Sequence, residues 1–195
     1  MFYKKSYIKT NMKYFVGLDL SLTGSGVTIL NDKGKVIKTA LIKSKKTGDK
    51  PSDELWRILG IRENIFKVID TLGLIDENGG NTVYYAIEGM AFLAKGTSLV
   101  QLAALNYFIR EWISYDKKDF VIVAPTSLKR FATGKGNSEK DHMILEAYKK
   151  FGLDNIDNNV ADSLFLASVA SMLFGKEKPT NNFQKETLDS LKKQL

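Results

Sequence analysis

The chain has 195 residues, 44% of them hydrophobic, so it can bury one substantial core and we expect a single main domain. It contains no cysteine, which excludes disulfides and thiolate metal sites and fits a reducing compartment such as the cytoplasm. Its net charge of +7 favours a polyanionic partner such as nucleic acid. No segment is apolar for long enough to span a membrane, so we expect no membrane partner.

The pattern of residues along the chain predicts three parts. Residues 1–12 are polar and basic and lack the apolar stretch of a signal peptide, so we interpret them as an N-terminal extension. Residues 13–176 hold the strongly patterned segments and form the expected domain. Residues 177–195 are predicted to be a polar C-terminal tail with an amphipathic stretch near 183–191.

The first part of the domain predicts three strands and a helix. Residues 14–20, 24–30 and 36–42 are rich in strand formers and are separated by tight turns, which is typical of an antiparallel meander. From Ser52 to Ile69, apolar residues then recur at helical spacing.

The rest of the domain alternates between strands and helices. Two short apolar runs predict strands, the second ending before Pro125, and a basic loop with two glycines follows it. The predicted elements are strands at 83–87 and 120–124, helices at 98–112, 138–152 and 159–174, and the loop at 131–138.

The order of these elements predicts the class of fold. An antiparallel meander followed by strand–helix crossovers implies a mixed sheet with helices on its faces. The sequence therefore predicts an α/β protein with a mixed five-stranded sheet, which is the layout of the ribonuclease H-like fold.

Three acidic residues occupy unusual places in these elements. Asp19 ends the first strand, Glu88 ends the fourth, and Asp162 lies in an apolar helix. Buried carboxylates need a partner, because they lose their hydration. If the first and fourth strands are neighbours, Asp19 and Glu88 emerge together, and Asp162 can pack over them. The alternative is that Asp19 caps a turn and Asp162 faces solvent.

Three converging carboxylates would repel each other unless a cation neutralised them. Hard oxygen ligands, without cysteine and with one histidine, point to Mg²⁺ or Mn²⁺ rather than zinc. Two such ions about 3.5–4 Å apart can activate water and stabilise the leaving oxygen of a phosphodiester. The sequence thus favours two ions in one active site.

Four segments, in this order, resemble the RuvC family of Holliday-junction resolvases over about residues 14–174. One is the G-x-D opening with its glycine turn, one an acidic segment, one a basic glycine loop and one an acidic helix. They are GLDLSLTGSGV (17–27), YAIEGMAFLAKGTSLVQLAAL (85–105), PTSLKRFATGKGNSEKDHM (125–143) and NVADSLFLA (159–167).

The resemblance implies an activity and its partners. It implies an Mg²⁺- or Mn²⁺-dependent endonuclease that resolves branched DNA, the four-way junction, with paired nicks. It also implies a homodimer with one site per strand, joined through the helix at 98–112. A bacterial or phage-infected host cell would be the setting.

The resemblance also assigns roles to individual residues. It makes the three acids metal ligands and makes Lys129 and Lys140 contacts of the scissile phosphate. The aromatic Phe92 would wedge into the junction centre. The expected site residues are Asp19, Glu88, Asp162, Lys129 and Lys140 for catalysis, with Phe92, Lys95 and Lys135 as further DNA contacts.

Two positions depart from the family pattern. Asn159 stands where the family has an acid or histidine, and it can offer an uncharged carbonyl oxygen as fourth ligand. Asp157 is the alternative if the helix begins irregularly. Phe92 lies one residue further from Glu88 than the family's aromatic does, and packing in a core or dimer interface is its alternative role.

Other functions stay open at this point. An ATP-using protein of the actin and sugar-kinase class would share Asp19, Thr23 and Gly24, but such proteins normally need two such domains. Asn159 also suits a junction-binding protein that has lost catalysis. A general ribonuclease H-like nuclease would cut flaps or RNA–DNA hybrids instead. His142 is expected to be a structural helix residue.

Overall fold

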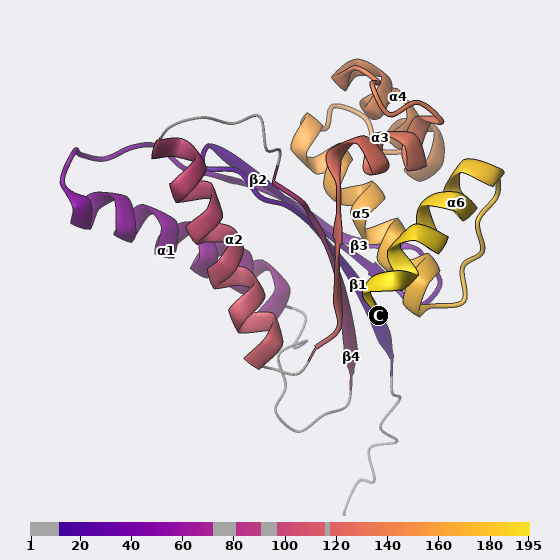
Figure 1. Ribbon diagram of the computed structural model, residues 1–195, viewed down its shortest axis with the longest axis horizontal. Helices are drawn as coiled ribbons and strands as arrows, with labels where there is room; N and C mark the ends of the chain where they lie inside the picture. Colours follow the sequence, from indigo (N-terminus) through magenta and orange to yellow (C-terminus); the bar gives the residue numbers. More distant parts are fainter. Residues whose placement is uncertain (1–11, 72–80, 91–96, 116–117) are drawn as a thin grey trace, which may run out of the picture.

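A single mixed sheet forms the centre of the computed structural model, which describes residues 12–71, 81–90, 97–115 and 118–195 (Figure 1). The strand order is β3-β2-β1-β4-β5. The first three strands pair antiparallel, whereas β4 lies parallel to β1 and β5 lies parallel to β4. The strands are β1 (Lys13–Asp19), β2 (Gly24–Asn31), β3 (Val36–Lys43), β4 (Thr82–Glu88) and β5 (Phe120–Val123).

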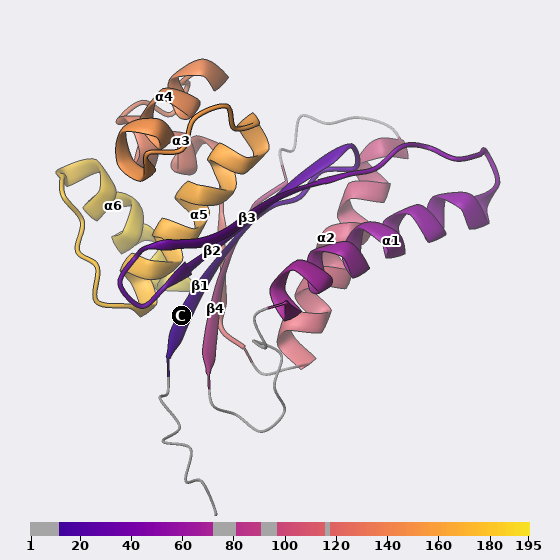
Figure 2. The same cartoon turned by 180° about the vertical axis from the view of Figure 1, so that it is seen from behind.

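Helices cover both faces of the sheet. α1 and α2 lie on one face, and α3 to α6 lie on the other, as the two opposite views show (Figures 1 and 2). A short 3₁₀ turn at Lys192–Gln194 follows the last helix. The helices are α1 (Pro51–Asp70), α2 (Thr97–Tyr115), α3 (Pro125–Thr133), α4 (Lys140–Phe151), α5 (Asn158–Phe174) and α6 (Asn182–Leu191).

The predicted mixed five-stranded α/β sheet is confirmed, together with the meander and the parallel placement of the fourth strand. One element was not predicted. Pro125 ends β5 but is also the first residue of α3, where its fixed φ suits a helix and its missing N–H is no loss. Residues 131–133 of the predicted loop are accordingly the last turn of α3.

The sheet separates two apolar cores. On the side of α1 and α2, isoleucines at helical spacing in α1 pack on the sheet, which explains the periodicity in its sequence. On the other side α5 is buried almost all round, with small residues such as Ala161 and Ala167 among its buried positions. The central helix can therefore lie very close to the strands.

Glycines in β1 and β2 permit the close approach of α5. A β-carbon at Gly17 would overlap the main-chain oxygen of Ser163, and one at Gly26 would overlap the main-chain oxygen of Asn159. The contact is also polar, because the hydroxyls of Thr28 and Ser163 are buried and hydrogen-bonded at 2.7 Å. The glycines of the opening segment therefore form the surface against which α5 packs, called here the glycine floor.

The C-terminal segment packs on the domain. The division into an extension, a domain and a tail stays a prediction, but residues 182–191 form α6, whose Leu188 and Leu191 lie in the core. Beyond it, Gln194 pairs with the edge strand: its amide oxygen accepts from the N–H of Ile122, and its amide nitrogen donates to the carbonyl of Ile122, both at 2.9 Å. Within the described residues, no helix is long and apolar enough to cross a bilayer.

Gly17→Ala tests the glycine floor. The added methyl group would push α5 off β1, and overpacking of this kind typically costs about 1–3 kcal/mol of unfolding free energy. Gly60→Ala is the matched control, because its β-carbon meets nothing within 4 Å and alanine favours a helix interior by about 1 kcal/mol. Urea unfolding should show a loss for Gly17→Ala and a gain for Gly60→Ala; equal stability of Gly17→Ala and wild type would contradict the packing.

Candidate active site

Asp19 and Glu88 leave the sheet side by side. Leu18 pairs with Ile87 in the parallel β1–β4 ladder, so the next residues of both strands emerge at the same end. The Asp19 side chain is only 5% exposed, and Glu88 lies close enough to raise its pKa. The first and fourth strands are therefore neighbours, and the two acids emerge together, as the sequence predicted for that case.

Asp162 joins this pair from the first turns of α5. Burial and the charge of Glu88 raise the pKa of Asp162 to about 7, and the charges of Lys129 and Lys140 partly offset that rise. The pKa of Asp19 is also raised well above its usual value, first by burial, then by the hydrogen bond with Glu88 and by repulsion from the other acids. Each carboxylate therefore lies in the field of the others.

The donor set fits a hard divalent cation. The Oδ1 atom of Asp162 is buried, and no hydrogen-bond donor within the described ranges reaches it. A cation would satisfy this atom and relieve the repulsion that raises the pKa values of Asp19 and Asp162. As positioned, no three acidic or histidine side chains of the described residues enclose an ion. Holding one therefore requires the carboxylates to turn toward it.

The start of α5 places both candidates for a fourth ligand. The side-chain nitrogen of Asn159 donates to the carbonyl of Gly24 at 2.6 Å, and its oxygen accepts from Asn158 at 2.7 Å. Asp157 caps the helix by accepting from the N–H of Asn159 at 2.9 Å, and its charge raises the pKa of both Asp19 and Asp162. The geometry thus gives Asn159 a clamping role and places the charge of Asp157 near the acids.

Two lysines face the acidic cluster from the neighbouring helices. Lys129 lies on α3 and Lys140 is the first residue of α4, and both lower the pKa of Asp162 by their charge. The sequence placed Lys129 beside a loop, whereas the structure fixes it on a helix. A group with negative charge that approached the acids would meet these two ammonium groups.

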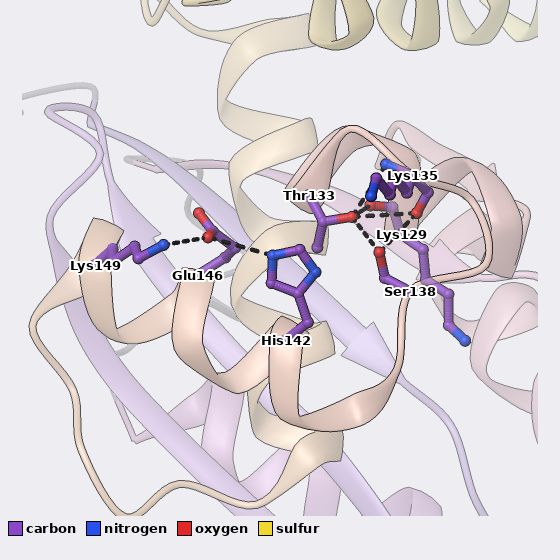
Figure 3. A network of polar contacts seen from close by, with 7 residues as sticks. All are labelled: Lys129, Thr133, Lys135, Ser138, His142, Glu146 and Lys149. Atoms are coloured by element: carbon purple, nitrogen blue, oxygen red, sulfur yellow. Dashed lines mark hydrogen bonds and ion pairs between the residues drawn. The ribbon is translucent and has the colours of Figure 1, made fainter.

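The loop between α3 and α4 is held by a hydroxyl network (Figure 3). Thr133 Oγ1 contacts Ser138 Oγ at 2.5 Å, donates to the Lys129 carbonyl at 2.8 Å and accepts from the Lys135 N–H at 3.1 Å. Gly134 has a left-handed φ of 81°, which ends α3. The loop therefore exposes Lys135 from a fixed backbone. Ser138 was expected to begin the next helix, but Glu139 is the residue that precedes α4.

The other predicted residues have different outcomes. His142 lies on α4 with its Nε2 3.5 Å from a carboxylate oxygen of Glu146 (Figure 3). This position agrees with a structural role. Phe92 and Lys95 lie outside the described residues, so their expected DNA contacts stay predictions.

Sequence reasoning missed how the turn after Asp19 is fixed. Ser25 Oγ donates to the Ser21 carbonyl at 2.8 Å and accepts from the Ser21 N–H at 3.0 Å. Arg57 of α1 donates to the carbonyl of Leu22 at 2.5 Å. The serine spacing in SLTGS is a sequence signal for the first contact, but the contact with Arg57 bridges 35 positions and has no local signal.

The sequence and the fold of the chain were compared with those of known proteins. No protein-family profile and no curated protein sequence matches the chain. A Thermus thermophilus RuvC structure matches with a TM-score of 0.59 and 15% identity, over 79% of this chain and 90% of that one. The fold is that of RuvC. T. thermophilus RuvC in complex with a Holliday junction substrate matches over the same shares with a TM-score of 0.60 and 16% identity.

The RuvC fold agrees with the resemblance of the four sequence segments. At 15–16% identity the similarity concerns the course of the chain and not its activity. The similarity of fold assigns no role to the acids, lysines and glycines of this chain. Their function follows from their geometry.

Asp162 predicts a pH dependence of stability. A raised pKa in the folded state means that the folded protein binds a proton at Asp162 more tightly than the unfolded chain does. The contribution of this proton to the free energy of unfolding is fully present below about pH 4 and is lost as the pH rises through about 7. The size of the effect is on the order of 4 kcal/mol in the absence of divalent cations. Asp162→Asn should flatten this decline and be the more stable protein at about pH 8.

Urea unfolding in the presence of a chelator, at several pH values, would measure this effect. The comparison of wild type with Asp162→Asn isolates Asp162 from the other titrating groups, Asp19 included. A wild-type curve as flat as that of the variant would show that Asp162 is not buried beside like charges.

Proposed function

We propose that the chain is a structure-selective DNA endonuclease that resolves four-way junctions by metal-dependent hydrolysis, leaving paired nicks. The main support is the convergence of Asp19, Glu88 and Asp162 beside Lys129 and Lys140, at one end of a sheet with the RuvC fold. A buried carboxylate cluster next to two ammonium groups suits a substrate that brings both phosphate charge and divalent cations.

The three carboxylates would hold Mg²⁺ or Mn²⁺, with two ions per site. When bound, such ions supply a polarised water and compensate the charge that develops on the leaving oxygen. Asp157 is the better fourth ligand in this proposal, because its charge acts on Asp19 and Asp162 and because the Asn159 oxygen is engaged by Asn158. Asn159 then keeps the start of α5 on β2.

The chain's own residues divide the remaining work. Lys129 and Lys140 hold the phosphate over the acids and stabilise the charge that develops on it. Lys135, exposed between two glycines, contacts a neighbouring phosphate. Phe92 and Lys95 are proposed as further DNA contacts. The turn that Ser25 and Arg57 fix keeps the Asp19 carboxylate in place.

Paired nicks require two active sites, and we propose a homodimer with α2 as the contact. Two apolar residues of α2, Val100 and Tyr107, are 68% and 63% exposed, as a contact surface would be in the single chain. The enzyme would act on branched DNA in the cytoplasm of a bacterium or of a phage-infected host cell.

Asp19→Asn tests the activity directly. Wild type and variant are incubated with a mobile four-way junction plus Mg²⁺ or Mn²⁺, and both strands are followed by labelled ends. We expect symmetric paired nicks with wild type and a loss of at least about 10³-fold with Asp19→Asn, because the site loses one of the three charges that would hold the cations. Equal cleavage by both proteins would overturn the proposal.

A pair of lysines on one helix tests the phosphate contact. Lys140→Met should lower the cleavage rate by about 10–10³-fold, because a donor aimed at developing charge is removed. Lys149→Met is the matched control on α4: Lys149 pairs with Glu146 at 2.7 Å, and its charge is not among the influences on Asp162. Its single-turnover rate should equal that of wild type. Equal rates for both variants would contradict the assigned role of Lys140.

One observation favours a second candidate, a junction-binding protein without cleavage. Asn159 is uncharged and already hydrogen-bonded to Asn158 and Gly24, so the position where the family has an acid or histidine offers no charged ligand. Tight junction binding with no nick at any Mg²⁺ or Mn²⁺ concentration would favour that function. Faster cutting of flaps or RNA–DNA hybrids than of junctions would instead favour a general ribonuclease H-like nuclease.

A further inference from the structure

The loop between β3 and α1 leaves the sheet at the end that bears the acids. Asp19 pairs with Gly26, and two residues earlier in β2, Gly24 pairs with Lys43, the last residue of β3. The Ser44 N–H donates to the carbonyl of Thr23 at 3.1 Å. The base of this loop is therefore tied to the turn that follows Asp19.

Arg57 strengthens this tie. One guanidinium nitrogen donates to the carbonyl of Leu22 at 2.5 Å, and Nε donates to the hydroxyl of Ser44 at 3.1 Å. One side chain of α1 thus fixes both the active-site turn and the start of the basic loop.

A hollow of about 250 Å³ lies beside the loop, and its lining is basic and aromatic. Lys43 and Lys45 are exposed in this lining, and Trp56 is 69% exposed. None of the residues that line it, all of them in the described part of the chain, is a carboxylate. The neighbouring hollow differs, because Asp49, Asp53 and Glu54 line it.

Gly60 leaves the floor of the hollow open. It lies one helical turn after Trp56, on the same face of α1, and a β-carbon there would meet nothing within 4 Å. Glycine disfavours a helix interior, and no close packing requires it at this position. Its effect on the molecule is to keep space free next to the indole.

We propose that this hollow binds an unpaired strand of the branched DNA, with a base stacked on Trp56 over Gly60 and the phosphates on Lys43 and Lys45. Every base has an aromatic face, so such a site takes a single strand with little regard to sequence. The hollow favours the anionic backbone of a nucleic acid strand, because its lining offers cations and hydrogen-bond donors and contains no carboxylate. That the strand belongs to branched DNA rests on the proposed function. The binding of a single strand in the hollow is argued from the lining residues alone.

Intrinsic fluorescence can report on this site because the chain has two tryptophans. Trp112 stacks on Phe66 with ring centroids 4.0 Å apart and packs against the core, so DNA should quench only Trp56. A short oligothymidine is titrated into Asp19→Asn without divalent cations, alone and combined with Trp56→Phe or Trp112→Phe. We expect quenching to persist with Trp112→Phe and to vanish with Trp56→Phe, and Trp56→Ala to weaken binding by about tenfold or more.

Gly60→Leu separates blocking from misfolding. Leucine favours the helix, so the variant should unfold at a concentration of urea no lower than the parent protein, yet its side chain should fill the hollow and abolish the quenching. Lys43→Ala and Lys45→Ala should each reduce the slope of log affinity against log salt by about one. Gly60→Leu that folds and is still quenched would overturn the proposal.

The remaining outcomes are also decisive. Quenching by duplex but not by oligothymidine would overturn the choice of an unpaired strand, and concentration-dependent self-association lost in Trp56→Phe would assign the surface to a second copy of the chain. If the junction is not cut but Trp56 is quenched, the proposed function fails and this inference stands. If the junction is cut and Trp56 is not quenched, this inference alone fails.

Discussion

The close approach of α5 to β1 and β2 is the constraint on which the structure depends. Gly17 and Gly26 leave no β-carbon under the helix, and the buried pair of Thr28 and Ser163 fixes its position. Asp162, one residue before Ser163, is thereby brought over the strand end that bears Asp19. Two apolar cores, one on each face of the sheet, hold this arrangement rigid.

Placing acids this close makes the site costly for the protein alone and favourable for cations. Burial and mutual repulsion raise the pKa of Asp19 and Asp162, and the lysines of α3 and α4 only partly offset the effect. The same ammonium groups stand where a phosphate would approach. Divalent cations that bound here would therefore relieve the repulsion between carboxylates that the fold itself creates.

The sheet and the positions of the acids in it could be predicted from the sequence, because they depend on local patterns of residues. Strand-forming runs ending in Asp19 and Glu88 predicted the sheet, and the strand pairing that joins those two acids follows from its topology. Two contacts had no local signal: the hydrogen bond from Arg57 to Leu22 bridges 35 positions, and the hydrogen bond from Asn159 to Gly24 forms only when the start of α5 packs on β2. Pro125 was interpreted as a stop, although proline also suits the first turn of a helix, where α3 begins.

We propose that α5 brings Asp162 to Asp19 and Glu88 to form a site for two divalent cations. Crystals soaked in Mn²⁺ and measured for anomalous scattering test it most directly, since the signal identifies the ion and its ligands together. We expect two Mn²⁺ peaks among these three carboxylates, and their loss in Asp162→Asn. Peaks bound elsewhere, or peaks that persist unchanged in the variant, would contradict it.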